Sequence, residues 1–302
     1  MDFSVNDLPV ICWTKSGEPR SALWRSESGV LPHSRVVIAD DSLRADAAYR
    51  LACNGTAMLW RGDFNNARQL LKALSRRLER KPRHKKRKAP KPMPSLTEAF
   101  HLHRQTRGHR ARILGMLLVT LESDYRVPLL RAPDVQQACI EAYGPGEQAS
   151  VLSLRELLGL IGAHEWRKKG VPIPALDSRI HPHYGVFSPV RGEYVGLVAE
   201  TPLPSLELAF DIGSGTGVLA AVLAHRGVAH VVATDLDTRA LACARENIAR
   251  LGLNGQVEVV YADLFPEGRA SLIVCNPPWI PARPSSPLTY RVKSILDYIE
   301  LR

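Results

Sequence analysis

Hydrophobic residues follow a regular order in the last third of the chain. Short apolar runs occupy residues 207–210, 231–234, 257–261 and 272–275, and stretches of helical periodicity occupy residues 217–225 and 238–251. Short apolar runs are typical of buried strands, and strands that alternate with helices are typical of a parallel sheet covered by helices. We therefore expect an α/β fold with a doubly wound core over residues 186–302.

The first 185 residues have a mixed pattern. β-rich runs at residues 35–39 and 57–60 precede a helical stretch with leucines on one face, so residues 1–80 predict a small mixed α/β segment. Residues 95–185 contain amphipathic patterns with many cations and predict a basic, mostly helical region.

Residues 81–94 separate these two parts. They contain seven Lys or Arg, four prolines and no acid. Proline disfavours a helix and like charges repel, so we expect an extended linker. Two functions fit this composition, a solvated spacer and an arm that follows the phosphates of an RNA.

The charge of the chain is concentrated in its first two thirds. The whole chain has 40 Lys and Arg against 30 Asp and Glu, a net charge of +10. Residues 201–302 contain 9 basic and 10 acidic side chains, so residues 1–200 hold 31 and 20. This asymmetry predicts that the first part binds a polyanion, and we expect RNA or the ribosome to contact residues 81–112.

Composition excludes several other classes of protein. The five cysteines are far apart and form no Cys-x-x-Cys pair, which argues against a disulfide framework and against a zinc ribbon. The best apolar stretch, residues 113–121, is less than half of a membrane span, and the N-terminus lacks the basic start of a secretory signal. We expect a cytoplasmic protein with no membrane contact and no metal.

A glycine-rich turn follows the first strand of the predicted core. Its residues are Asp211, Gly213, Gly215 and Gly217, at the junction between a strand and a helix. Glycines at such a junction allow a sharp turn and a close approach of a ligand to the backbone. The spacing differs from that of the dinucleotide-binding fingerprint, so the turn alone names no ligand.

Acidic residues follow the next two strands. Asp235 ends the strand after the glycine turn, where a carboxylate can accept hydrogen bonds from both hydroxyls of a ribose. Asp237 is a competing acid, and a helix cap is its alternative role. Asp263 follows the third strand, where it can accept from an adenine amino group or serve as a turn residue.

The fourth strand ends in Asn276, Pro277, Pro278 and Trp279. The two prolines remove two backbone donors and stiffen the turn. The Asn276 side chain, the Pro277 carbonyl and an aromatic plane remain, and this set suits a flat group that carries an NH2. These residues are our candidates for the catalytic site.

These four elements, in this order, resemble the class I S-adenosylmethionine-dependent methyltransferases. They resemble most the branch that methylates amino nitrogens, which includes DNA adenine methylases, ribosomal-RNA methylases and HemK-type glutamine methylases. The resemblance covers about residues 180–282. It implies a Rossmann-like core, S-adenosylmethionine as cofactor, and methyl transfer to a planar amino nitrogen.

The resemblance leaves the target open. RNA or a ribosomal component is the preferred target, because the basic part precedes the core. The alternatives are a protein-glutamine N-methyltransferase of HemK type and an inactive nucleic-acid-binding remnant. The segment around residues 184–194 departs from the HemK form, which argues against glutamine as the target.

The core also departs from the family at its C-terminal side. Only 23 residues follow Trp279, whereas the family's sheet continues through three more strands. A crossover unit needs on the order of 30 residues. We therefore expect a core that is truncated after its fourth strand, with uncertain activity.

Overall fold

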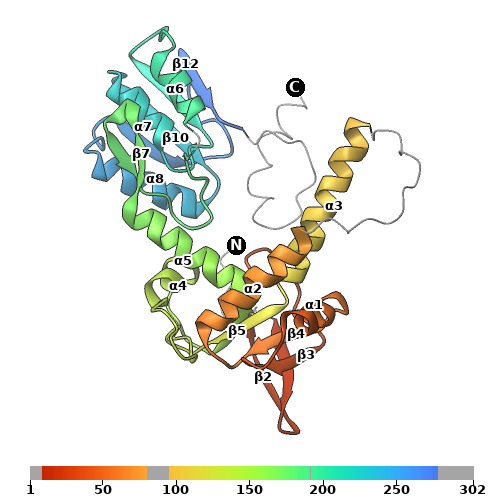
Figure 1. Ribbon diagram of the computed structural model, residues 1–302. Helices are drawn as coiled ribbons and strands as arrows, with labels where there is room; N and C mark the ends of the chain where they lie inside the picture. The colour runs from red at the N-terminus through yellow and green to blue at the C-terminus, as the bar shows by residue number, and fades with distance from the viewer. Residues whose placement is uncertain (1–8, 80–94, 191, 278–302) are drawn as a thin grey trace. The chain divides into compact units, whose positions relative to one another are not determined.

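The computed structural model describes residues 9–79, 95–190 and 192–277 of the chain (Figure 1). The chain forms two compact units. The first contains residues 1–26 and 30–159, and the second contains residues 27–29 and 160–302.

The first unit contains a six-stranded mixed sheet. In spatial order its strands are β1 (Val10–Lys15), β2 (Glu18–Trp24), β6 (Ser150–Ser153), β5 (Leu117–Leu121), β4 (Ala57–Trp60) and β3 (Val36–Ala39). Strands β3, β4 and β5 are parallel, while β6 is antiparallel to β5 and parallel to β2. All four residues of β4 are buried, as expected for a central strand covered on both faces.

Four helices accompany this sheet, and a fifth leads out of it. They are α1 (Ala45–Cys53), α2 (Phe64–Glu79), α3 (Leu96–Leu114), α4 (Gln136–Tyr143) and α5 (Leu154–Lys169). Helix α2 buries Phe64, Ala67, Leu70 and Leu74 at helical spacing. Helix α3 is different, because residues 98–112 are all exposed.

The structure divides the first part of the chain differently from the expectation. Residues 95–185 were expected to be mostly helical, yet β5 and β6 lie in this range and join the sheet formed by residues 10–60. Leu117–Leu121 and Ser150–Ser153 are short runs of largely buried residues. In such short runs the hydrophobic pattern does not distinguish a buried strand from a buried helix. Only the pairing with β4 and β2 shows that both runs are strands.

The second unit contains the expected α/β core. It begins with β7 (Val171–Ile173), a 3-10 turn at Pro174–Leu176, β8 (Ser178–Ile180) and α6 (Glu193–Glu200), and continues with β9 (Leu208–Ile212), α7 (Val218–His225), β10 (His230–Asp235), α8 (Thr238–Arg250), β11 (Val257–Tyr261) and β12 (Leu272–Cys275). The spatial order β11-β10-β9-β12 is entirely parallel. The α/β class is therefore confirmed.

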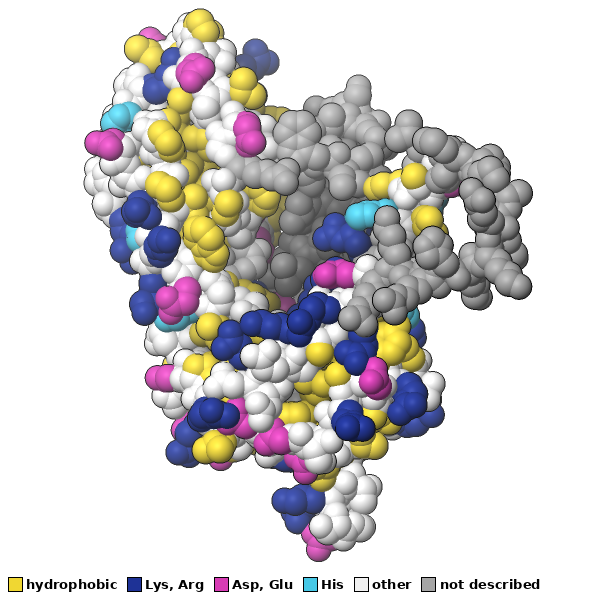
Figure 2. Space-filling model, viewed as in Figure 1, with side chains coloured by type: hydrophobic (Ala, Val, Ile, Leu, Met, Phe, Trp, Pro, Cys, Tyr) yellow, Lys and Arg dark blue, Asp and Glu magenta, His cyan; other side chains and the backbone are white. Residues whose placement is uncertain are grey.

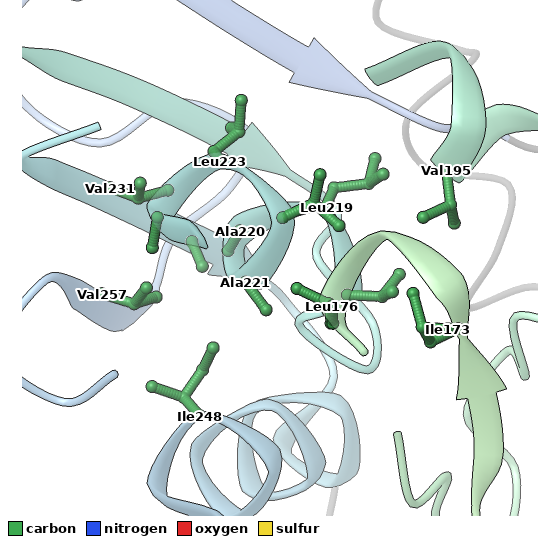
Figure 3. Packing of buried hydrophobic residues seen from close by; sticks show 14 of the residues in the cluster. Ile173, Leu176, Val195, Leu219, Ala220, Ala221, Leu223, Val231, Ile248 and Val257 are labelled. Carbon is green, nitrogen blue, oxygen red and sulfur yellow. The ribbon is translucent and has the colours of Figure 1, made fainter. Parts of the chain in front are cut away.

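The helix α7 lies in the main core of this unit. Its residues 218–224 are all buried, and they pack with Ala209, Val231 and Val257 of the sheet and with Ile248 of α8 (Figure 3). A smaller cluster around Phe210 and Val232 lies on the opposite face of the sheet. Leu264 and Ala270, from the connection before β12, pack against it. The chain adds β10 and β11 on one side of β9 and then returns to add β12 on the other side, so the strand order reverses between β9 and β12. Open α/β sheets bind ligands at such a switch point.

Two expectations concern the limits of the chain. The truncation of the core after its fourth strand depends on residues 278–302, which lie outside the described residues. Within the described ranges, no helix combines the length and the apolar character needed to cross a membrane.

Candidate active site

The strand register brings the predicted motifs to one edge of the sheet. Ile212 pairs with Thr234 of β10 on one side and with Cys275 of β12 on the other. The next residues along the three strands are Gly213, Asp235 and Asn276. Because the strands are parallel, these residues follow each other across the carboxyl edge of β10, β9 and β12.

The glycine turn depends on backbone angles that favour glycine. The φ angles are +68° at Gly213, +57° at Gly215 and +77° at Gly217, all in the left-handed region. A Cβ at Gly217 would lie 3.2 Å from both Cα and Cβ of Ala244, so this glycine also permits close packing of the turn against α8.

Asp235 holds the glycine turn from the neighbouring strand. Its Oδ2 accepts a hydrogen bond from the Gly215 amide at 3.0 Å, and its Oδ1 accepts from the Asp237 amide at 2.9 Å. Burial raises the pKa of Asp235, and these two amides act in the opposite direction. Asp237 itself caps α8, because its Oδ1 accepts from the Arg239 amide at 2.9 Å. Asp235 therefore lies against the glycine turn, whereas Asp237 caps the helix that follows.

Asp211 lies below the turn, inside the core. Its side chain is 1% exposed, and its Oδ2 accepts a hydrogen bond from the Ala220 amide in the first turn of α7 at 3.0 Å. Gly217 precedes this helix and has no side chain to cap it, so Asp211 supplies the missing acceptor. Burial raises the pKa of Asp211 to about 7.

The remaining candidates lie at the ends of β11 and β12. Asp263 belongs to the connection after β11, whose Leu264 carbonyl accepts a hydrogen bond from Thr234 Oγ1 at 2.7 Å. Asn276 and Pro277 directly follow β12 and are half-buried. Pro278 and Trp279 were also predicted, and they lie outside the described residues.

Asn247 is a site residue whose role the sequence did not reveal. It is 1% exposed on α8, and its Nδ2 donates to the Thr216 carbonyl of the glycine turn at 3.0 Å. Its Oδ1 accepts from the His181 amide at 2.8 Å, and its Nδ2 also donates to the His181 carbonyl at 3.2 Å. One side chain therefore connects α8, the glycine turn and the segment after β8.

His183 of this segment lies in a cluster of charged side chains. His183 Nε2 lies 2.6 Å from Glu246 Oε2, and Arg167 forms an ion pair with the same oxygen at 2.7 Å. Burial alone would raise the pKa of Glu246, but hydrogen bonds from Arg250 and His183 and the charge of Arg167 outweigh it and lower the pKa to about 2. In the described part of the chain, no group of three His, Cys, Asp or Glu side chains could hold a metal ion.

The segment after His183 lies against the glycine turn. A Cβ placed on Gly215 would lie 4.0 Å from Cγ1 of Val186. Arg239 approaches the same segment, since a Cβ on Gly185 would lie 3.3 Å from its Nη1, and it forms an ion pair with Glu27 at 3.0 Å. The turn is therefore bordered by Val186 on one side and by the strand-end residues on the other.

Comparison with known proteins identifies relatives of the second unit. Residues 178–288 match the family model of the methyltransferase small domain. The release factor glutamine methyltransferase of Cereibacter sphaeroides is 40% identical over 107 residues, which cover 34% of this chain and 38% of that protein. The tRNA1(Val) (adenine(37)-N6)-methyltransferase of Bacteroides fragilis is 42% identical over 89 residues, covering 28% of this chain and 38% of that protein.

A third relative has a different substrate in its name. The ribosomal protein L11 methyltransferase of Symbiobacterium thermophilum is 46% identical over 66 residues, which cover 22% of each chain. The chain therefore spans less than two fifths of the length of each of these three relatives.

Proposed function

We propose that residues 178–288, which match the family model of the methyltransferase small domain, act as a class I S-adenosylmethionine-dependent enzyme and transfer a methyl group to a planar amino nitrogen. One observation carries this proposal. The register of β10, β9 and β12 places Asp235, the glycine turn and Asn276 side by side at the carboxyl edge of the sheet. Asp235 and the glycine turn would hold the cofactor, and Asn276 would hold the group that receives the methyl.

The residues at this edge fit S-adenosylmethionine. The three glycines leave backbone without side chains on the turn, so a ligand can approach closely. Each carboxylate oxygen can accept about two hydrogen bonds. In Asp235, Oδ2 accepts one from the Gly215 amide and Oδ1 accepts one from the Asp237 amide, so each oxygen can accept another. Asp235 can therefore accept both hydroxyls of a ribose. When bound, the cofactor supplies an electrophilic methyl group on a sulfonium sulfur.

Asn276 and Pro277 would orient the nitrogen that receives the methyl group. An amide oxygen and a backbone carbonyl are acceptors, and together they can hold both hydrogens of an NH2 group. This arrangement aims the nitrogen lone pair along one direction and stabilises the positive charge that develops on nitrogen. In this proposal Pro278 limits the freedom of the turn and Trp279 stacks on the flat target group. Asp263 accepts from the adenine amino group of the cofactor.

RNA or a ribosomal component is our proposed target, in the cytoplasm. Residues 1–200 carry 31 basic and 20 acidic side chains, whereas residues 201–302 carry 9 and 10, so the polyanion-binding charge lies outside the catalytic region. Two of the relatives have tRNA and a ribosomal protein in their names, which supports a target in the translation machinery.

Protein glutamine is a second candidate target. It is favoured by the 40% identity over 107 residues to the release factor glutamine methyltransferase, since a glutamine side chain also ends in a planar NH2 group. The two targets would use the same acceptors at Asn276 and Pro277.

Incubation with methyl-labelled S-adenosylmethionine and separated RNA and protein fractions tests this function. We expect label in RNA, and Asn276→Ala should lower the rate about 10²–10³-fold, as loss of one transition-state hydrogen-bonding group does. Asn254→Ala, at an exposed position after α8, is the matched control and should keep full activity. Label in protein alone would favour glutamine, and no transfer to either fraction by a chain that binds the cofactor would favour an inactive remnant.

A further inference from the structure

Helix α3 lacks the buried face that normally stabilises a helix in a folded protein. Residues 98–112 are exposed all round the helix, and burial begins only at Ile113 and Leu114. Most of the stability of a helix in a folded protein comes from packing of its apolar face, so a helix that is polar all round needs another source of stability. A capping box between Ser95 and Glu98 stabilises the start of α3, while the ion pair of Arg110 with Glu79 at 2.6 Å connects its last part to α2.

The exposed part of α3 is predominantly basic, and its one acid, Glu98, lies in the first turn and takes part in the capping box. Residues 99–112 contain four Arg and three His and no acid, and the preceding residues 80–97 contain no acid either. Figure 2, drawn from the same side as Figure 1, shows basic and histidine side chains along this helix. Like charges on one short helix repel each other, so a polyanion would stabilise it.

An aromatic side chain lies on the same face as the cations. Phe100, Arg104 and Arg107 follow each other at intervals of four and three residues, which places them along one side of a helix. The Phe100 ring is 40% exposed, and the Arg104 guanidinium lies over it at 5.8 Å from the ring centroid. We call these three residues the α3 stripe.

The α3 stripe combines the two groups that single-stranded nucleic acids require. Bases stack on exposed aromatic rings, and arginines bind the phosphates between them. A base in a duplex is already stacked and paired, so an exposed ring has little to offer to a double helix. An acidic peptide would pair with the arginines but would make no stacking contact with Phe100.

We propose that the α3 stripe binds single-stranded RNA, with Phe100 as a stacking platform and Arg104 and Arg107 on the phosphates. This inference deepens the proposed function, on which it rests for the choice of RNA as substrate. The site lies on the first unit, apart in the chain from the cofactor-binding residues of the second.

Fluorescence anisotropy with a labelled 15-nucleotide oligo(A) RNA and the full chain tests the role of Phe100. Phe100→Ala should weaken binding about tenfold, because stacking of one base contributes roughly 1–3 kcal/mol. Phe100→Trp should keep the affinity. Leu102→Ala is the matched control, since Leu102 is 60% exposed on another side of the same helix and should have no effect.

Salt dependence separates the stripe from general charge attraction. Arg107→Ala should reduce the slope of log affinity against log salt by about 0.7, the value for one phosphate contact of a single strand. Arg112→Ala removes the same charge from another side of the helix and should leave the slope unchanged. Equal effects of the two variants, or equal binding of Phe100→Ala and the unmodified chain, would overturn the proposal.

Measuring the binding of S-adenosylmethionine to the same variants distinguishes a failure of the α3 proposal from a failure of the proposed function. Every α3 variant should bind the cofactor as the unmodified chain does. If RNA binding is insensitive to the stripe while labelled methyl groups still enter RNA, the inference about α3 fails and the proposed function stands. If neither cofactor binding nor transfer is found, the proposed function fails whatever α3 binds.

Discussion

The side-chain amide of Asn247 donates to the Thr216 carbonyl at 3.0 Å and connects helix α8 to the glycine turn. The same side chain closes a pair of hydrogen bonds with the backbone of His181. Three segments that are far apart in the sequence therefore share one buried side chain. Their relative position determines the shape of the turn, so Asn247 is a positioning residue for the candidate site.

Asn247→Ala should destabilise the second unit. The substitution leaves the His181 amide and carbonyl and the Thr216 carbonyl without this partner, and each buried polar group left unpaired costs about 1–3 kcal/mol. Urea denaturation should show a decrease of at least the cost of one such group. Asn254→Ala, at an exposed position, is the control, and an equally small change in both variants would contradict the role of Asn247.

Gly217→Ala tests the close packing of the turn. Both Gly217 (φ +77°) and Gly227 (φ +91°) have backbone angles that disfavour alanine, and such a residue costs about 1–2 kcal/mol. Only at Gly217 would the new Cβ also lie 3.2 Å from Ala244, because nothing lies within 4 Å at Gly227. The free energy of unfolding should therefore fall further in Gly217→Ala than in Gly227→Ala.

Equal losses of stability in these two variants would mean that the turn adjusts to the added methyl group. The contact with Ala244 would then have no part in holding the turn against α8, and backbone strain alone would explain the glycine.

The pH dependence of stability should reflect Asp211. Burial raises its pKa to about 7 in the folded state, from an ordinary value of 3.8. Between these two pH values the folded state holds the proton more tightly, so the contribution of Asp211 to stability falls as the pH rises from about 4 to about 7 and is constant above that. The expected loss is on the order of 1–4 kcal/mol.

Asp211→Asn removes this pH dependence while it keeps an acceptor for the Ala220 amide. Its stability measured at pH 5 and at pH 8 should differ less than that of the unmodified chain. Identical pH profiles for the two proteins would show that Asp211 ionises with its ordinary pKa despite its burial.

The sequence predicted the second unit well because its signals are local. Strands such as Leu208–Ile212 and Leu272–Cys275 are short apolar runs, and the glycine turn between β9 and α7 is marked by its own residues. The resemblance to the methyltransferases was confirmed for this region by the family match. The positions of Asp235 and Asn276 at one edge follow from parallel pairing, which alternating strands and helices already indicate.

The parts that sequence could not predict depend on distant partners. The pattern of Leu117–Leu121 fits a helical region, and only its pairing with β4 and β6 shows that it is a strand. Helices α2 and α3 separate it from β4 in the sequence, and α4 separates it from β6. Asn247 lies within an ordinary amphipathic helix, and only the folded arrangement brings Thr216 and His181 to it. A buried amide of this kind has no local sequence signal.

Calorimetric titration with S-adenosylmethionine is the most direct test of the central claim, that Asp235 and the glycine turn hold this cofactor. Asp235→Asn removes the carboxylate, and charge-assisted hydrogen bonds contribute about 1.5–3 kcal/mol each, so its affinity should fall tenfold or more. Asp237→Asn is the matched control, because asparagine caps a helix as well as aspartate does and Asp237 caps α8. The account predicts saturable binding by the unmodified chain and by Asp237→Asn, and weak binding by Asp235→Asn; equal affinities of all three proteins, or no binding by the unmodified chain, would contradict it.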